Sequence, residues 1–160
     1  MTRASSHPIV EHGPSRPMVS VLRFCGLEGS SIAAGIRSGL DALRSLGRDL
    51  GGSTGPAYVI YRNRQPGSVV VEVGMPLPEG AAYRNTGEFR SGRTPKGAAL
   101  QGDAHAWGNS LVDAQTQLCE LAQKHGLEHE PYWWQVFEDI GDLGWVDDPP
   151  TVNLPVRLPA

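Results

Sequence analysis

The chain has 160 residues, a mass of 17.2 kDa and a formal net charge of −3, and 39% of its residues are apolar. This composition is ordinary for a soluble globular protein, and the length suits one domain with its own core. The negative net charge argues against a general nucleic-acid-binding protein, and no apolar run approaches the roughly 18 residues that a membrane-spanning helix needs.

Residues 1–17 contain several prolines and histidines but no apolar stretch. We therefore expect a flexible N-terminal tail here, not a signal peptide, which favours a cytoplasmic location. The remaining residues, 18–160, are predicted to form the folded domain.

The first half of this domain is predicted to begin with a strand and a helix. Residues 18–24 alternate loosely between apolar and polar side chains, which is typical of a strand. Apolar residues then recur at steps of three and four from Ile32 to Leu50, which predicts an amphipathic helix. Gly35 and Gly39 lie inside this helix, where each costs about 1 kcal/mol relative to alanine. They are candidates for a close approach between the helix and a sheet.

Two apolar strands follow the helix. The first begins at Pro56, and the second covers residues 68–75. The sequence Gln65-Pro66-Gly67 between them is a turn signal, so the two strands are predicted to form a hairpin.

The second half repeats this order of elements. Residues 76–95 are predicted to connect the halves, with a strand near residues 83–90, and a further strand is predicted at 96–103. Asn109 or Ser110 then caps a helix that ends at Gly126. Strands beginning at Pro131 and Thr151 complete the half. Each half therefore has the order strand, helix, strand, strand.

Local sequence supports a duplication. The segment PAYVIYR begins at Pro56, and PYWWQVF begins at Pro131; in each, a proline precedes an aromatic and apolar strand. We predict an α+β fold of two βαββ units, at about residues 18–78 and 83–158. Two similar halves usually meet at a cleft, and here the strands nearest that cleft are rich in aromatic residues.

Several segments, in order, resemble the GyrI-like small-molecule-binding domain, which is also the effector-binding domain of AraC-type and MerR-type multidrug regulators. They are GPAYVIY from Gly55, VEVGMPL from Val71, TPKG from Thr94, the helix at 107–126 and WQVF from Trp134. The resemblance covers about residues 18–158. It implies a pseudo-twofold axis, an antiparallel sheet with two helices, and a central ligand cleft that is lined by aromatics and often centred on one glutamate. That glutamate falls at Gln135 here, and the tyrosine that accompanies it falls at Phe137.

The candidate site follows from this resemblance and from strand alternation. Alternation places Trp133, Gln135 and Phe137 on one face of their strand, and the resemblance selects this face as the cleft. Val59 and Tyr61 would face it from the first half. Whether Glu72, in a matched motif, reaches the cleft is left open. The predicted ligand-binding residues are Val59, Tyr61, Glu72, Trp107, Trp133, Gln135 and Phe137.

These residues favour a binding pocket over a catalytic centre. Aromatic walls suit flat hydrophobic ligands, and a cation over such rings gains about 0.5–2 kcal/mol. Gln135 supplies only a neutral amide, so a preference for cations is left open. We expect no cofactor and no metal site: His125 and His129 have helical spacing, but Gly126 between them ends the helix.

The leading functional prediction is a stand-alone sensor or sequestering protein for hydrophobic, planar small molecules, either neutral or cationic. No helix-turn-helix segment is predicted, so we expect no direct nucleic-acid binding, and control of transcription would need an unknown protein partner. We expect no membrane binding, because the sequence has no long apolar run. One alternative is a hydrolase of strained, drug-like electrophiles, although Gln135 and Phe137 remove the expected general base and hydroxyl donor. Another is a protein-interaction module, such as a modulator of DNA gyrase, which uses the acidic stretch at 138–148.

Overall fold

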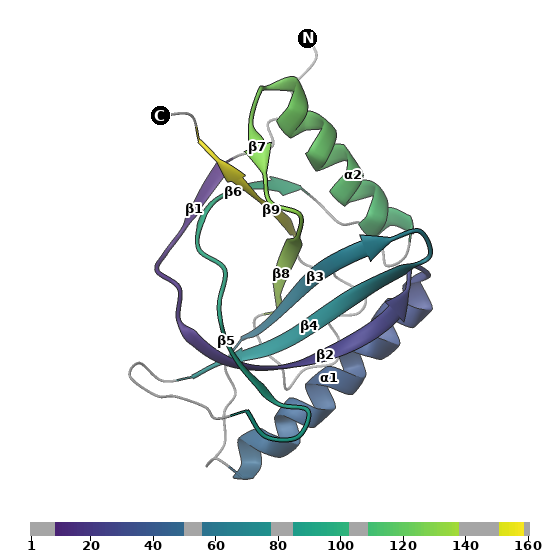
Figure 1. The fold of residues 1–160 in the computed structure, drawn as a ribbon, viewed down its shortest axis with the longest axis vertical. Helices are drawn as coiled ribbons and strands as arrows, with labels where there is room; N and C mark the ends of the chain where they lie inside the picture. The colour runs from purple at the N-terminus through teal and green to yellow at the C-terminus, as the bar shows by residue number, and fades with distance from the viewer. Residues whose placement is uncertain (1–8, 50–55, 78–84, 103–108, 138–150, 159–160) are drawn as a thin grey trace.

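The computed structural model describes residues 9–49, 56–77, 85–102, 109–137 and 151–158. In chain order the elements are β1 (Ile9–His12), β2 (Pro17–Gly26), α1 (Gly29–Asp49), β3 (Ala57–Gln65), β4 (Ser68–Pro76), β5 (Arg90–Arg93), β6 (Gly97–Gly102), α2 (Asn109–Lys124), β7 (Glu128–His129), β8 (Trp133–Phe137) and β9 (Val152–Arg157). Figure 1 shows the two helices lying against a strongly curved sheet.

The strands of the described residues form one antiparallel sheet in the order β1-β6-β9-β8-β3-β4-β2-β5, with β7 paired to β9. The predicted α+β class, with an antiparallel sheet and two helices, is confirmed. At the centre β3 pairs with β8. The strands β2, β3 and β4 lie on one side of this contact and β6, β8 and β9 on the other, each set with one helix inserted after its first strand. A duplication of the two units stays a prediction.

Each helix packs on the outer strands of its own half. Helix α1 lies against β2 and β4, and α2 lies against β6, β7 and β9. The stripe predicted for α1 is its buried side, since Ile32, Ile36, Leu40 and Leu43 are at most 1% exposed. The central strands β3 and β8 therefore run between the two helix-covered regions. Neither helix, over its described residues, is long and apolar enough to cross a bilayer.

Helix α1 approaches the sheet closely at Gly35 and at Gly39. A Cβ atom placed at Gly39 would lie 2.7 Å from Cγ2 and 2.9 Å from Cβ of Val73, on β4. A Cβ atom at Gly35 would overlap Sγ of Cys25, on β2. Both glycines therefore allow helix α1 to lie close to the sheet, as predicted from the sequence.

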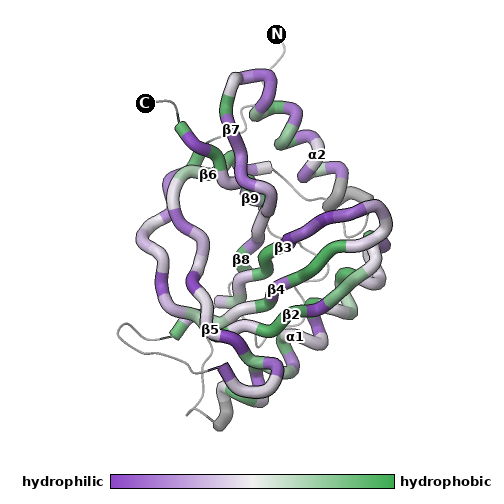
Figure 2. The backbone as a smooth tube through the Cα atoms, viewed as in Figure 1, coloured by the Kyte–Doolittle hydropathy of each residue, from purple (hydrophilic) through white to green (hydrophobic). Residues whose placement is uncertain are grey.

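The β3–β4 hairpin has the predicted turn. Gly67 adopts φ of +87°, and the pairing register shifts between Arg62 and Gln65, where Asn63 also has a positive φ. Figure 2 shows hydrophobic residues along β4 and a hydrophilic end of β3 next to the turn. The hairpin therefore has a buried middle and a solvated tip.

Three boundaries differ from the sequence prediction. Ile9–His12, inside the predicted flexible tail, forms β1 and pairs with β6, so this part of the tail is an ordered edge strand. The strand expected near residues 83–90 is instead Arg90–Arg93, because Gly87, with φ of +60°, and a Thr86–Phe89 bridge make a turn before it. Strand β9 runs from Val152 through Pro155 to Arg157, whereas the sequence predicted a short extended segment at 151–154 that ends at the Pro155-Val156 pair.

Candidate functional site

Five of the predicted site residues meet at the centre of the sheet. The β3–β8 register places Val59 opposite Gln135, Tyr61 opposite Trp133 and Ala57 opposite Phe137. The apolar and aromatic members belong to the main core together with residues of both helices. We call Val59, Tyr61, Trp133, Gln135 and Phe137 the helix-facing cluster.

The helix-facing cluster is buried. Its five side chains are at most 3% exposed. Strand alternation and the resemblance therefore selected residues that share one face and one neighbourhood. The open cleft predicted beside them stays a prediction.

A buried hydrogen bond joins the two halves inside this cluster. The Tyr61 hydroxyl donates to Oε1 of Gln135 at 2.6 Å. Burial, with a smaller contribution from Cys25, raises the pKa of Tyr61 well above its usual value, so its phenol remains protonated and can donate. None of the five cluster residues carries a carboxylate, so the polar groups of the cluster are neutral.

Trp133 supplies both a ring surface and an unsatisfied donor. Its ring stacks on Tyr61, with centroids 5.1 Å apart and planes 11° apart. Its Nε1 is buried and has no hydrogen-bond partner in the part of the chain that the structure describes. A buried donor without a partner costs about 1–3 kcal/mol. An acceptor on a bound molecule would remove that cost.

The structure does not bring Glu72 to the helix-facing cluster. Glu72 lies across from Leu22 and Ile60 on the opposite face of the sheet. There its carboxylate accepts hydrogen bonds from Ser20 Oγ at 2.7 Å and from Arg62 Nε at 2.9 Å. Trp107 and the acidic stretch at 138–148 lie outside the described residues.

The opposite face carries a second aromatic group that sequence reasoning did not assign to a site. Trp134, Ile60 and Met18 are buried there, with Tyr58 and Tyr132 packed against them and no helix residue among them. His12, on β1, meets Trp134 edge to face with ring centroids 4.5 Å apart. Burial of its ring lowers the pKa of His12, which favours the neutral imidazole. Part of this group could have been found from the sequence, because strand alternation puts Tyr58 and Ile60 of PAYVIYR, and Tyr132 and Trp134 of PYWWQVF, on the face opposite the helix-facing cluster.

Two grooves lie beside this face. One, of about 350 Å³, is lined by His12, Arg16, Tyr58 and Trp134 among others. The other, of about 410 Å³, is lined by Arg62, Arg93, Lys96 and Tyr132 among others. Thr94 and Pro95 line both grooves, so the segment between β5 and β6 separates them.

We expect Tyr61→Phe to lower the free energy of unfolding by about 1–2 kcal/mol, because it removes the donor to a buried amide oxygen. A double-mutant cycle with Gln135→Leu, followed by urea unfolding, isolates the Tyr61–Gln135 term. Tyr58→Phe is the control, because the half-buried Tyr58 hydroxyl makes no hydrogen bond to a described residue. If the changes in the free energy of unfolding of Tyr61→Phe and Gln135→Leu are strictly additive, the hydrogen bond between the two side chains contributes no stability.

Comparisons with known proteins give matches at the level of structure. No protein-family model matches the chain, and no curated protein matches its sequence. The crystal structure of the EcmrR C-terminal domain is similar, with a TM-score of 0.63 and 13% identity over 94% of this chain and 96% of that one. The structure of SAV2435 bound to tetraphenylphosphonium is similar too, with a TM-score of 0.55 and 11% identity over 95% of this chain and 94% of that one. At these identities the likeness concerns the fold alone, and it agrees with the predicted α+β fold of an antiparallel sheet and two helices.

Proposed function

We propose that the protein binds hydrophobic small molecules with aromatic rings at the helix-facing cluster, and that it acts as a sensor or a sequestering protein. The observation that carries this proposal is the buried Nε1 of Trp133, which has no acceptor among the described residues, beside the stacked ring of Tyr61. Buried polar groups in proteins nearly always have a partner. A ligand with an acceptor would supply one, and its rings would pack on Trp133 and Tyr61. The fold agrees with this use, since a structure of SAV2435 contains tetraphenylphosphonium.

The cluster favours a neutral acceptor over a cation. Gln135 offers an amide where the GyrI-like resemblance places a glutamate, and Glu72 lies on the other face. A cation at this site would therefore gain from the aromatic rings alone, which is worth about 0.5–2 kcal/mol. We propose planar or multi-ring molecules with a carbonyl-type or phosphoryl-type oxygen as the preferred class, and cations as a weaker class.

Entry to the cluster requires a conformational opening. Because its side chains are at most 3% exposed, a ligand reaches them only when the packing around β3 and β8 separates. The apparent affinity is then the intrinsic affinity multiplied by the populated open fraction. We expect association to be slower than diffusion allows, because such rearrangements lower association rate constants.

Isothermal titration with triphenylphosphine oxide tests the proposal, because this neutral probe has three rings and one strong acceptor. We expect micromolar binding, and Trp133→Phe should weaken it about tenfold, the worth of one lost hydrogen bond of about 1.4 kcal/mol. Trp134→Phe is the matched control, because its ring lies next in sequence but on the opposite face. Circular dichroism of both variants checks that they remain folded.

The absence of micromolar binding to this probe and to a panel of planar neutral compounds would contradict the proposed function. An equal loss of affinity in the two tryptophan variants would instead place the ligand elsewhere. We propose binding without turnover, since a hydrolase would need a general base and none of the five cluster residues supplies one. Mass spectrometry of the recovered ligand checks this point.

A further inference from the structure

A groove of about 410 Å³ lies on the far side of the sheet centre from the helix-facing cluster. It forms where the segment between β5 and β6 passes Tyr132, just before β8, and Pro155, on β9. The volume is in the range of small-molecule sites. Its charged lining residues are Arg62, Arg93, Lys96 and Glu130.

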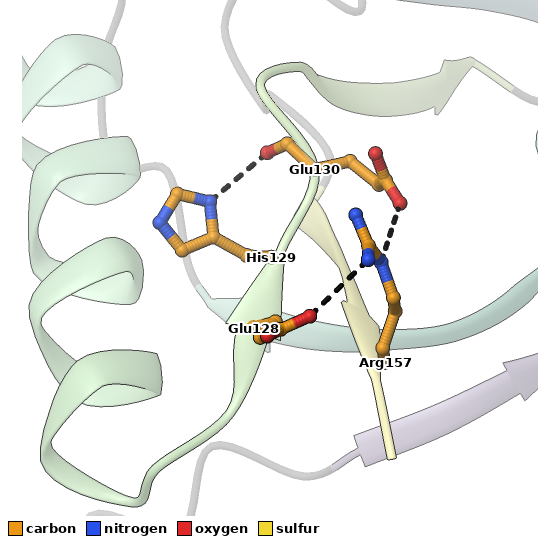
Figure 3. A network of polar contacts seen from close by, with 4 residues as sticks. All are labelled: Glu128, His129, Glu130 and Arg157. Carbon is orange, nitrogen blue, oxygen red and sulfur yellow. Dashed lines mark hydrogen bonds and ion pairs between the residues drawn. The ribbon is translucent and has the colours of Figure 1, made fainter. Parts of the chain in front are cut away.

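Two of these four charged residues, Arg62 and Glu130, take part in ion pairs. Glu130 accepts from Arg157 Nε at 3.1 Å, and the same guanidinium also contacts Glu128, as Figure 3 shows. Arg62 is paired with Glu72 through its Nε, at 2.9 Å. Because Arg157 is shared between Glu128 and Glu130, these ion pairs neutralise Arg62 and only part of the charge of Glu130. The excess positive charge of the groove therefore comes from the remaining side chains.

Arg93 and Lys96 supply that excess. Neither is within 4.0 Å of a carboxylate oxygen in the portion of the chain that the structure describes. Arg93 is nevertheless held in place, because its Nε and Nη2 donate to Oγ and the backbone oxygen of Ser15 at 2.9 and 2.8 Å. The groove thus has a fixed guanidinium and a nearby ammonium, in a chain whose net charge is negative.

The remaining wall is aromatic and apolar. Tyr132 is half-buried, with the Arg62 guanidinium 5.0 Å from its ring centroid, and Pro155 lines the groove with it. The Tyr132 hydroxyl has no hydrogen-bond partner among the described side chains and backbone. Burial raises the pKa of Tyr132, so the hydroxyl is a donor at neutral pH.

From this arrangement we infer that the groove binds a small aromatic carboxylate. The carboxylate lies between Arg93 and Lys96, where charge-assisted hydrogen bonds are available. The aromatic ring packs against Tyr132 and Pro155. This site is independent of the function proposed for the helix-facing cluster, because it uses the other face of the sheet and requires no opening of the core.

Isothermal titration of the Trp133→Phe variant with 2-naphthoate and its neutral counterpart 2-naphthamide tests the inference, because this variant weakens the binding of neutral carbonyl compounds at the helix-facing cluster. We expect naphthoate to bind at least tenfold more tightly at about 20 mM salt, with the difference reduced at 200 mM because the charges are near solvent. Lys96→Gln should weaken naphthoate binding about fivefold, and Arg93→Gln combined with Lys96→Gln should remove the preference for the acid.

Arg37→Gln is the matched control, since Arg37 is an exposed arginine of α1 that lies outside the groove. Lys96→Gln alone keeps the test valid if loss of the Arg93–Ser15 bonds disturbs the fold. Equal affinity for the acid and the amide would overturn the inference, and so would an equal effect of Arg37→Gln and Lys96→Gln. Trp133→Phe should leave naphthoate binding unchanged, so the failure of one site is distinguishable from the failure of the other.

Discussion

Replacing Gln135 with glutamate is expected to increase the affinity for tetraphenylphosphonium by at least about 30-fold. The substitution places a carboxylate among the aromatic residues of the helix-facing cluster, where Gln135 is fully buried. Two opposite unit charges about 5 Å apart attract by about 3 kcal/mol at an effective dielectric constant near 20. Part of this attraction is offset by desolvation, so the expected gain is smaller than the Coulomb energy alone would give. This expectation rests on the proposed ligand site.

The same substitution should destabilise the free protein at neutral pH. A buried carboxylate without a cation favours its protonated form, so its folded-state pKa is raised above the unfolded value. The free energy of unfolding of the variant is therefore highest below the pKa that the glutamate has in the unfolded chain. It falls as the pH rises through the higher pKa of the folded state. The Tyr61 hydroxyl, which donates to Gln135, would donate to the new carboxylate and offset part of this loss. We expect tetraphenylphosphonium to raise the melting temperature of the variant more at pH 8 than at pH 5.

Titration calorimetry and thermal unfolding with tetraphenylphosphonium and triphenylphosphine oxide measure both effects. Val136→Glu is the matched control, because it adds the same charge to the same strand on the opposite face. If Val136→Glu binds tetraphenylphosphonium as tightly as Gln135→Glu does, the net charge of the protein and not the position of the carboxylate determines the affinity. If Gln135→Glu leaves the ratio of the affinities for tetraphenylphosphonium and triphenylphosphine oxide unchanged, the helix-facing cluster is not the ligand site.

Gly39→Ala is expected to lower the free energy of unfolding by about 1–3 kcal/mol, the range for an overpacked core. On an exposed helix the change would stabilise by about 1 kcal/mol. At Gly39 the new methyl group would meet Cγ2 of Val73 at 2.7 Å and its Cβ at 2.9 Å, and a β-branched core residue cannot move away without disturbing β4. The steric cost should therefore exceed the gain in helix propensity.

Urea unfolding of this variant, with Ser45→Ala as an exposed control on the same helix, measures the balance of the two effects. We expect the midpoint to fall in Gly39→Ala and to remain nearly unchanged in Ser45→Ala. Stabilisation by Gly39→Ala would show that α1 can move away from the sheet at little cost. In that case the contact between Gly39 and Val73 would not fix the position of the helix.

Local sequence patterns were sufficient to predict both helices, most of the strands and the side chains that share a face. Steps of three and four from Ile32 predicted α1 and its buried side, because a helix repeats every 3.6 residues. Alternation placed Trp133, Gln135 and Phe137 together, because strand side chains alternate between faces. These signals lie within a few residues of one another along the chain. They can therefore be read without knowledge of which strands pair.

Contacts that depend on the pairing of distant strands could not be predicted from local patterns and are seen in the folded structure alone. The register of β3, β4 and β8 places Glu72 away from Gln135 and brings the Tyr61 hydroxyl to it. Arg93, Lys96 and Tyr132 line one groove because of the path that the chain takes between β5 and β6, which local patterns do not predict. Such contacts are fixed by the free energy of the whole sheet, since a shift of one residue in register would exchange the two faces of a strand.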